Sequence, residues 1–322
     1  MFADLALIAV VIEAMVGYPD AVYRLIGHPV TWIGRLITRC DEAWNSGAKT
    51  AAARRNAGVV TLLLLIACAL AAGAALTILL SSLLGGILAL VPCGLLASSL
   101  LAQRSLDSHV LAVVTGLERE GVAGGRAAVA HIVGRQTSSL DEPAICRAAI
   151  ESLAENFSDG VVAPLFWMVI AGLPGALAYK AINTADSMIG HKSERYIDFG
   201  WASARCDDWV NLPASRLSAL WLVLAAALLG LSPGRALATV RRDARHHRSP
   251  NAGWPEAAIA GALDIRLSGP RIYDGVPVEE RWVGEGRSDL AARDIRRALK
   301  LYRTGCGLQI AVVAVVMVII LF

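Results

Sequence analysis

Residues 56–103 read NAGVVTLLLLIACALAAGAALTILLSSLLGGILALVPCGLLASSLLAQ, and none of these 48 residues is Asp, Glu, Lys or Arg. One bilayer crossing takes about 20 apolar residues, so the stretch is long enough for two. We expect two membrane helices, at 59–80 and 83–102, joined in a hairpin across Ser81 and Ser82. The stretch therefore places the chain among multi-pass membrane proteins.

The composition of the whole chain agrees with this class. Of the 322 residues, 56% are hydrophobic and 18% are charged, whereas about a quarter of an ordinary soluble domain is charged. The formal charge is only +3 and no basic run is interleaved with aromatic residues, so a nucleic-acid partner is not expected. The six cysteines form no CxxC pair, which argues against a zinc site. We predict an all-α fold with one integral membrane domain over 1–322 and about five apolar helices, within a range of four to six.

Four further apolar segments lie at 2–18, 161–179, 217–231 and 305–322. The first contains Glu13, which would cost about 2.5 to 3.5 kcal/mol at the centre of a bilayer. The second contains two prolines, so it either crosses the membrane or re-enters it. Lys and Arg are enriched in the loops 19–58, 103–160 and 234–304, and the positive-inside rule places these loops in the cytoplasm. The 180–216 loop has five basic and five acidic residues, so its side stays open.

The region 141–216 contains most of the polar residues that solubility does not require, and we predict that it forms the active site. Asp141 followed by Pro143 is typical of a helix start. We expect a helix from there to about residue 157, with Gly160 as its stop.

An arginine-rich segment, 234–304, is predicted to be helical and cytoplasmic. Ser288 is expected to cap a helix over 289–303, separate from the last membrane helix. His246 and His247 lie in RRDARHHRSP, which is typical of a solvated basic helix end.

One acidic stretch, ESLAENFSDG at 151–160, has acids at every fourth position. Glu151, Glu155 and Asp159 would share one helix face, where they repel one another unless a cation neutralises them. Magnesium, which binds one or two carboxylates together with substrate phosphates, is one such cation. The alternative is a solvated acidic face paired with Arg147.

A second polar stretch covers 180–211. One helix face there holds Lys180, Asn183 and Ser187, with Asp186 beside it. Further on, Asp207, Asp208 and Asn211 form a DDxxN cluster whose oxygens suit octahedral Mg²⁺. Nearby cations, Arg195 and Arg205 among them, could hold phosphate. A solvated loop of mixed charge is the alternative.

Three other residues have two interpretations each. Tyr196 and Trp201 could form the wall of a pocket or anchor the chain at the membrane interface. His28, in GHPVTWIG, could contact substrate or act only as a structural hydrogen bonder.

Several of these motifs together resemble a known family. They are HPVTWIGRLI, ENFSDGVVAPLFW, GALAYKAINTADSMIGHKSERYIDFGWASARCDDWVN and NAGWPEAAIAGALDIRLSGP. The combination is similar to the CobD/CbiB family of cobalamin biosynthesis, which are membrane adenosylcobinamide-phosphate synthases. The resemblance covers nearly the whole chain.

The resemblance implies an ATP-dependent amide synthase. In such a reaction (R)-1-aminopropan-2-ol O-phosphate, or the free aminopropanol, is joined to a propionate carboxylate of adenosylcobyric acid. The implied cofactors are ATP as co-substrate and Mg²⁺. The implied setting is the cytoplasmic membrane with the active-site loops inside, and candidate partners are other membrane enzymes of late cobalamin assembly and a second copy of the chain.

The resemblance also assigns roles to residues. It implies catalytic roles for Glu155, Asp159, Lys180, Asp186, Asp207 and Asp208. It implies substrate binding by His28, Asn156, Asn183, Ser187, Arg195, Tyr196, Trp201, Arg205 and Asn211. It implies Mg²⁺ ligands among Glu155, Asp186 and Asp208.

Two other functional classes of membrane protein stay open. One is a non-enzymatic AmpE-like membrane sensor or assembly protein, which would not need Lys180, Asp186 and the Asp207 and Asp208 pair together. The other is a Mg²⁺-dependent lipid or prenyl transferase, which would need a second Asp-rich motif on another helix.

Overall fold

The computed structural model describes residues 2–321 apart from 135, 274–275 and 279. Helix covers 78% of the structure, which confirms the all-α prediction. The chain divides into two compact units. The first unit comprises Met1–Ala102, Ala163–Asn211 and Val312–Phe322, and the second comprises Gln103–Val162 and Leu212–Ala311. The single membrane domain stays a prediction.

The elements fall into these units as follows. The first contains α1 (Ala3–Val16), α2 (Asp20–Ile26), α3 (Pro29–Trp44), α4 (Ala51–Leu84), α5 (Gly86–Ser98), α8 (Ala163–Ile189), α9 (Trp201–Val210) and the end of α13 (Ala292–Leu321). The second contains α6 (Gln103–Val129), α7 (Glu142–Asn156), the π-helix η1 (Phe157–Val162), α10 (Leu212–Leu228), α11 (Pro233–Asp243), the short 3-10 helix η2 (Ala244–His246), α12 (Gly253–Leu263) and the start of α13.

Four short strands interrupt the segment that was predicted to be wholly helical, 234–304. They form two antiparallel ribbons, β1 (Leu267–Ser268) with β4 (Trp282–Val283) and β2 (Arg271–Tyr273) with β3 (Val276–Val278). The prediction for this segment is therefore wrong between α12 and α13.

Several helices are suited to a bilayer. Among the described residues, four helical stretches are long and apolar enough to cross it: Ala51–Leu84, Gly86–Val129, Glu142–Ile189 and Ala292–Ile320. Two bent helix pairs bring the number to six. These values agree with the predicted four to six spans, and the chain is a multi-pass membrane protein.

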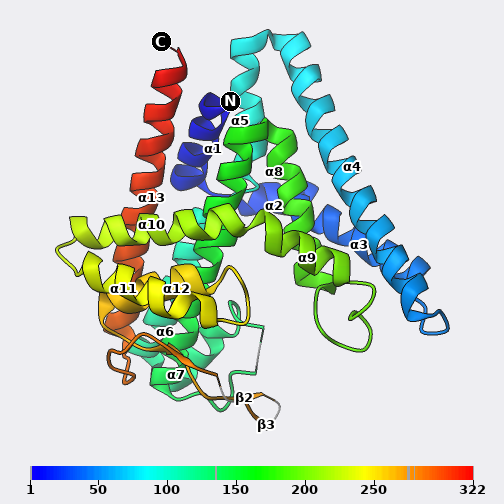
Figure 1. Ribbon diagram of the computed structural model, residues 1–322. Coiled ribbons are helices and arrows are strands. Elements are labelled where there is room, and N and C mark those ends of the chain that lie inside the picture. Colours follow the sequence, from blue (N-terminus) through cyan, green and yellow to red (C-terminus); the bar gives the residue numbers. More distant parts are fainter. Residues whose placement is uncertain (1, 135, 274–275, 279, 322) are drawn as a thin grey trace. The chain divides into compact units, whose positions relative to one another are not determined.

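The hairpin of α4 and α5 is present, but its turn lies later than predicted (Figure 1). α4 continues through Ser82, whose hydroxyl donates to the carbonyls of Ile78 and Leu79 within the helix. The helix ends at Gly85, which has a φ of 80° and donates its N–H to the Ser81 carbonyl. Glycine takes this left-handed conformation without steric cost, so it and not the serine pair ends the helix.

α8 packs through a row of residues spaced by four. Ala181, Ala185 and Ile189 are buried in one cluster with Ile37 of α3 and Leu65 of α4. Small side chains let membrane helices approach closely, so this row holds α8 against its neighbours. The polar residues of α8 are left on its other faces.

α8 is also kinked, close to where it meets α4. Ala171 and Gly172 depart from helical geometry, Gly172 with a φ of 64°, and Pro174 follows. At Gly73 of α4, an added Cβ would lie 2.6 Å from the Pro174 Cα. The contact between α4 and α8 therefore requires glycine at this position.

In the second unit, α7 begins as predicted, but the helical chain does not stop at Gly160. The Asp141 side chain accepts a hydrogen bond from the Ala144 N–H at 2.9 Å and caps the helix. Beyond α7, η1 carries the helical chain through Gly160, which is buried. Phe157 of η1 packs edge-on against Tyr302, with ring centroids 5.3 Å apart. This packing stabilises a helical path that local sequence did not indicate.

α13 is one helix where two were predicted, and it begins at Ala292 and not at 289. The cap is Asp294, which accepts a hydrogen bond from the Ala291 N–H at 3.0 Å, and not Ser288. The helix continues through Gly305, where an added Cβ would lie 3.3 Å from the Phe157 ring.

The fold predicts that Gly73→Ala destabilises the protein. The new methyl group would overlap Pro174, and overpacking of this kind costs about 1–3 kcal/mol. Thermal unfolding of the detergent-solubilised protein measures the loss. Gly86→Ala is the matched control, because an added Cβ there meets nothing within 4 Å. Equal unfolding temperatures for the two variants would contradict the proposed contact between α4 and α8.

Candidate active site

Most of the predicted site residues gather in the first unit, on α8, on α9 and on the segment between them. α8 carries Lys180, Asn183, Asp186 and Ser187. α9 carries Trp201, Arg205, Asp207 and Asp208, and Asn211 follows its last turn. The two helices pack against each other and against α4 through Ile182, Ala202 and Leu62. The apolar contacts thus fix the spacing of the polar groups.

Asp207 is the buried centre of this cluster. Only 8% of its surface is exposed, and Asn211 is fully buried. Asn183 donates to one Asp207 oxygen at 3.3 Å, and Asn211 donates to the other at 2.9 Å. The Tyr179 hydroxyl in turn donates to the Asn211 side-chain oxygen at 2.9 Å. Asp207 is therefore held in one orientation and connects α8 to α9.

Two more carboxylates lie close to Asp207 and are less buried. Asp186 interacts electrostatically with both Asp207 and Asp208. Three neighbouring carboxylates repel one another, so a cation near them is favoured. Cationic side chains supply part of this charge, because Lys192 and Arg205 act on Asp208.

A magnesium site is compatible with these groups but is not preformed. Among the described residues, no group of three or more His, Cys, Asp or Glu side chains is placed to hold a metal ion. Mg²⁺ is commonly held by one or two carboxylates, with water and substrate phosphates as its other ligands. Asp186 and Asp208 suit this mode better than Asp207, because both Asp207 oxygens already accept amide hydrogen bonds. The magnesium ligands stay a prediction.

His28 lies at the start of α3 and has a structural role. Its Nδ1 accepts a hydrogen bond from the Val30 N–H at 3.2 Å and caps α3. Thr31 completes the cap by accepting a hydrogen bond from the His28 N–H at 3.2 Å. His28 also interacts electrostatically with Lys180. Both interpretations of this residue are thus compatible with its position.

Arg195 and Tyr196 contact a residue that sequence reasoning missed, Asp41. Asp41 is buried at the end of α3 and accepts hydrogen bonds from Arg195 at 2.6 Å and from the Tyr196 hydroxyl at 3.3 Å. The hydrogen bond from Arg195 and the charge of Asp41 raise the pKa of Arg195. Asn45 adds a donor to Asp41 at 2.7 Å and a second one to the Arg195 carbonyl. These contacts hold the segment between α8 and α9.

The structure also shows the surroundings of the other predicted site residues of the first unit. Trp201 is partly exposed and lies under the Arg55 guanidinium, 3.6 Å from the ring centroid. The Ser187 hydroxyl donates to the Asn183 carbonyl at 2.9 Å. Arg205 is exposed on α9. The substrate-binding roles of these residues stay predictions.

Glu155, Asn156 and Asp159 belong to the second unit. Glu151 and Glu155 lie four residues apart on α7, as predicted, and Asp159 lies beyond this helix. Glu151 is buried and accepts a hydrogen bond from the Ser268 N–H at 2.7 Å, whereas Glu155 is exposed. Asp159 lies in η1, whose wider turns break the spacing of four. Asn156 donates to Ser152.

Comparison with known proteins gives a match over almost the whole chain. The family model described as CobD/Cbib protein matches residues 6–302. A protein named "Cobalamin biosynthesis protein CobD" from Rhodobacter capsulatus is 49% identical over 317 residues, which cover 98% of each chain. Proteins of the same name from Rhizobium meliloti and Brucella suis are 50% and 44% identical, covering 94% and 98% of this chain and 93% and 97% of their own. No solved structure matches the chain significantly.

The geometry predicts that Asn211→Ala destabilises the site. The substitution removes a donor to Asp207 and the acceptor of the Tyr179 hydroxyl, and losses of this kind cost about 1–3 kcal/mol. Thermal unfolding in detergent measures the change. Asn56→Ala, on the exposed surface of α4, is the control and should stay within about 0.5 kcal/mol of the parent. An unfolding temperature of Asn211→Ala equal to that of the parent would contradict the role assigned to Asn211.

Proposed function

The chain belongs to the CobD/CbiB family, and we propose that it is a cobalamin-biosynthesis enzyme that forms an amide bond with ATP. Its proposed substrates are adenosylcobyric acid and (R)-1-aminopropan-2-ol O-phosphate or the free aminopropanol. The products are adenosylcobinamide phosphate or adenosylcobinamide.

One observation in the structure supports the proposal most. A buried, doubly hydrogen-bonded Asp207 places Asp186 and Asp208 beside each other, with cationic Lys192 and Arg205 nearby. Carboxylates and cations in one cluster suit a reaction in which phosphoryl groups are bound and transferred. A membrane sensor would not require this combination.

The proposed reaction has two steps. The propionate carboxylate of the corrinoid attacks the terminal phosphorus of ATP, which forms an acyl phosphate and releases ADP. The amine then attacks the acyl carbon, gives up a proton and displaces inorganic phosphate. Magnesium, when bound, screens the charge of the phosphates. Asp186 and Asp208 would hold that ion. Arg205 and Lys180 would orient the phosphoryl oxygens, and Asp207 would keep α8 and α9 in register.

The proposal is tested by turnover of the purified protein. Adenosylcobyric acid, Mg-ATP and either amino alcohol should give the amide, detected by mass spectrometry, and removal of ATP or magnesium should abolish it. Asp208→Asn should reduce the rate about 100-fold or more, because it removes one of the two carboxylates proposed to hold the magnesium ion. Asp289→Asn, which removes one exposed carboxylate outside the cluster, should leave the rate unchanged. Absence of product with both amino alcohols would contradict the proposed activity.

We also propose that the segment between α8 and α9 lies on the cytoplasmic side of the cytoplasmic membrane, because ATP is cytoplasmic. A reporter fused after Arg205 should give a cytoplasmic signal. A periplasmic signal would contradict the placement of the site on α8 and α9.

A further inference from the structure

Helix α10 of the second unit carries an arginine at the start of a row of exposed leucines. Arg216 lies in its second turn, and Leu220, Leu224 and Leu228 follow at intervals of four, each at least 41% exposed. Residues four apart form one ridge along a helix surface. The buried residues of α10 lie on its other faces, and α10 belongs to one of the two bent helix pairs that could cross the bilayer. The leucine ridge is therefore a surface that contacts lipid.

The Arg216 guanidinium is held in place by neutral groups. Its Nη1 atom donates to three oxygens, those of the Leu212 carbonyl at 3.2 Å, the Ser215 hydroxyl at 2.9 Å and the Asn251 side chain at 3.0 Å. Its Nε and Nη2 atoms donate to no residue that the structure describes, and no carboxylate among those residues pairs with Arg216. The guanidinium is thus fixed at one nitrogen and keeps the N–H groups of the other two for a further acceptor.

Trp254, at the start of α12, supports the guanidinium from one side. Its ring centroid lies 4.3 Å from the Arg216 Cζ, and its indole N–H donates to the Pro250 carbonyl at 3.1 Å. Tryptophan is enriched at the level of the lipid headgroups, where its ring meets apolar chains and its N–H meets polar groups. An arginine stacked on a tryptophan beside a leucine ridge is typical of this interface.

A second arginine, Arg245 of η2, adds positive charge near Arg216. The two side chains interact electrostatically. Within the described part of the chain, Arg245 forms no side-chain hydrogen bond or ion pair, and it is exposed. Two like charges without a counterion repel each other, so an anion close to both is favoured.

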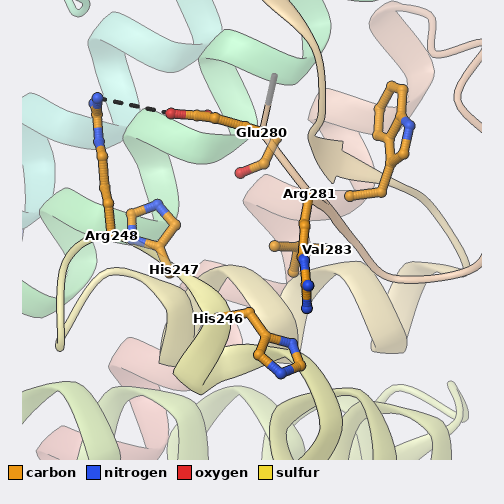
Figure 2. A pocket seen from close by; sticks show the side chains of 8 residues that line it. His246, His247, Arg248, Glu280, Arg281 and Val283 are labelled. Atoms are coloured by element: carbon orange, nitrogen blue, oxygen red, sulfur yellow. Dashed lines mark ion pairs between the residues drawn. The ribbon is translucent and has the colours of Figure 1, made fainter. Parts of the chain in front are cut away.

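The residues that follow Arg245 differ from it, because they line a cavity (Figure 2). His246 and His247 were expected to form a solvated helix end, and the structure places them in the cavity wall instead. Arg248, in the same wall, pairs with Glu280 at 3.7 Å (Figure 2). The charge of Arg248 is thus balanced by a carboxylate of the protein, whereas that of Arg245 is not.

We propose that α10 binds an anionic phospholipid, with the lipid phosphate at Arg216 and an acyl chain along the ridge of Leu220, Leu224 and Leu228. The Nε and Nη2 groups of Arg216 match two phosphate oxygens. Arg245 supplies a second positive charge, which favours a headgroup with net negative charge over a zwitterionic one. The inference uses only groups of the second unit and does not depend on the proposed reaction.

The test is a lipid titration of the full-length protein in detergent, followed by native mass spectrometry. Dioleoylphosphatidylglycerol is the probe. Dioleoylphosphatidylcholine has the same chains without net charge and should bind about tenfold more weakly. Glycerophosphoglycerol, the phosphodiester headgroup without chains, should show no saturable binding over the same concentrations. Equal affinity for the two lipids, or glycerophosphoglycerol binding as tight as that of phosphatidylglycerol, would overturn the proposal.

Variants locate the bound lipid on α10. Arg216→Gln should weaken phosphatidylglycerol binding about tenfold or more, since it removes charge-assisted hydrogen bonds. Arg245→Gln changes an exposed side chain, keeps the test valid if Arg216→Gln does not fold, and should weaken binding about fivefold. Arg293→Gln is the matched control, because it removes an exposed arginine of α13 outside this surface, and it should bind as the parent does. Parent-like binding by Arg216→Gln and Arg245→Gln, or an equal loss in Arg293→Gln, would contradict the site.

Discussion

A buried carboxylate must be hydrogen-bonded, and Asp207 is the carboxylate on which the polar cluster depends. An ionised group that is taken out of water without hydrogen-bond partners is costly in free energy. The side chains that donate hydrogen bonds to it are therefore held in place together with it. Asn183 comes from α8 and Asn211 from the end of α9, and each occupies one oxygen of Asp207. A single carboxyl group thus joins two helices. Asp186 and Asp208 take their positions as a consequence.

The apolar side of the same helices makes that arrangement possible. Ala181 and Ala185 let α8 approach its neighbours, and Gly73 lets α4 approach the kink at Pro174. Helices gain little from the hydrophobic effect within a bilayer, so close packing of small residues is the main source of attraction there. α8 therefore carries its packing residues on one face and its functional residues on the others.

The sequence predicted well what depends on composition and on local geometry. The uncharged run at 56–103 predicted the hairpin, and Asp141 with Pro143 predicted the start of α7. The DDxxN spacing correctly identified Asp207 and Asn211 as neighbours, since four residues make one helix turn.

What the sequence did not predict depends on partners far along the chain. Asp41 is buried by Arg195, which lies more than a hundred residues away, and no local pattern indicates that pair. Gly160 was predicted to end the helix, and the packing of Phe157 in η1 against the distant Tyr302 could not be known from local sequence. His247 was interpreted as solvated for the same reason, since Glu256 and β4 come later in the chain.

The central claim is that the α8 and α9 cluster binds the phosphates of the nucleotide. A cryo-electron-microscopy map of the full-length protein with magnesium and a non-hydrolysable ATP analogue tests this most directly. We expect triphosphate density beside Asp208 and Lys180, with a metal ion next to the Asp186 and Asp208 carboxylates. Triphosphate density elsewhere in the protein, with this cluster unchanged, would contradict it.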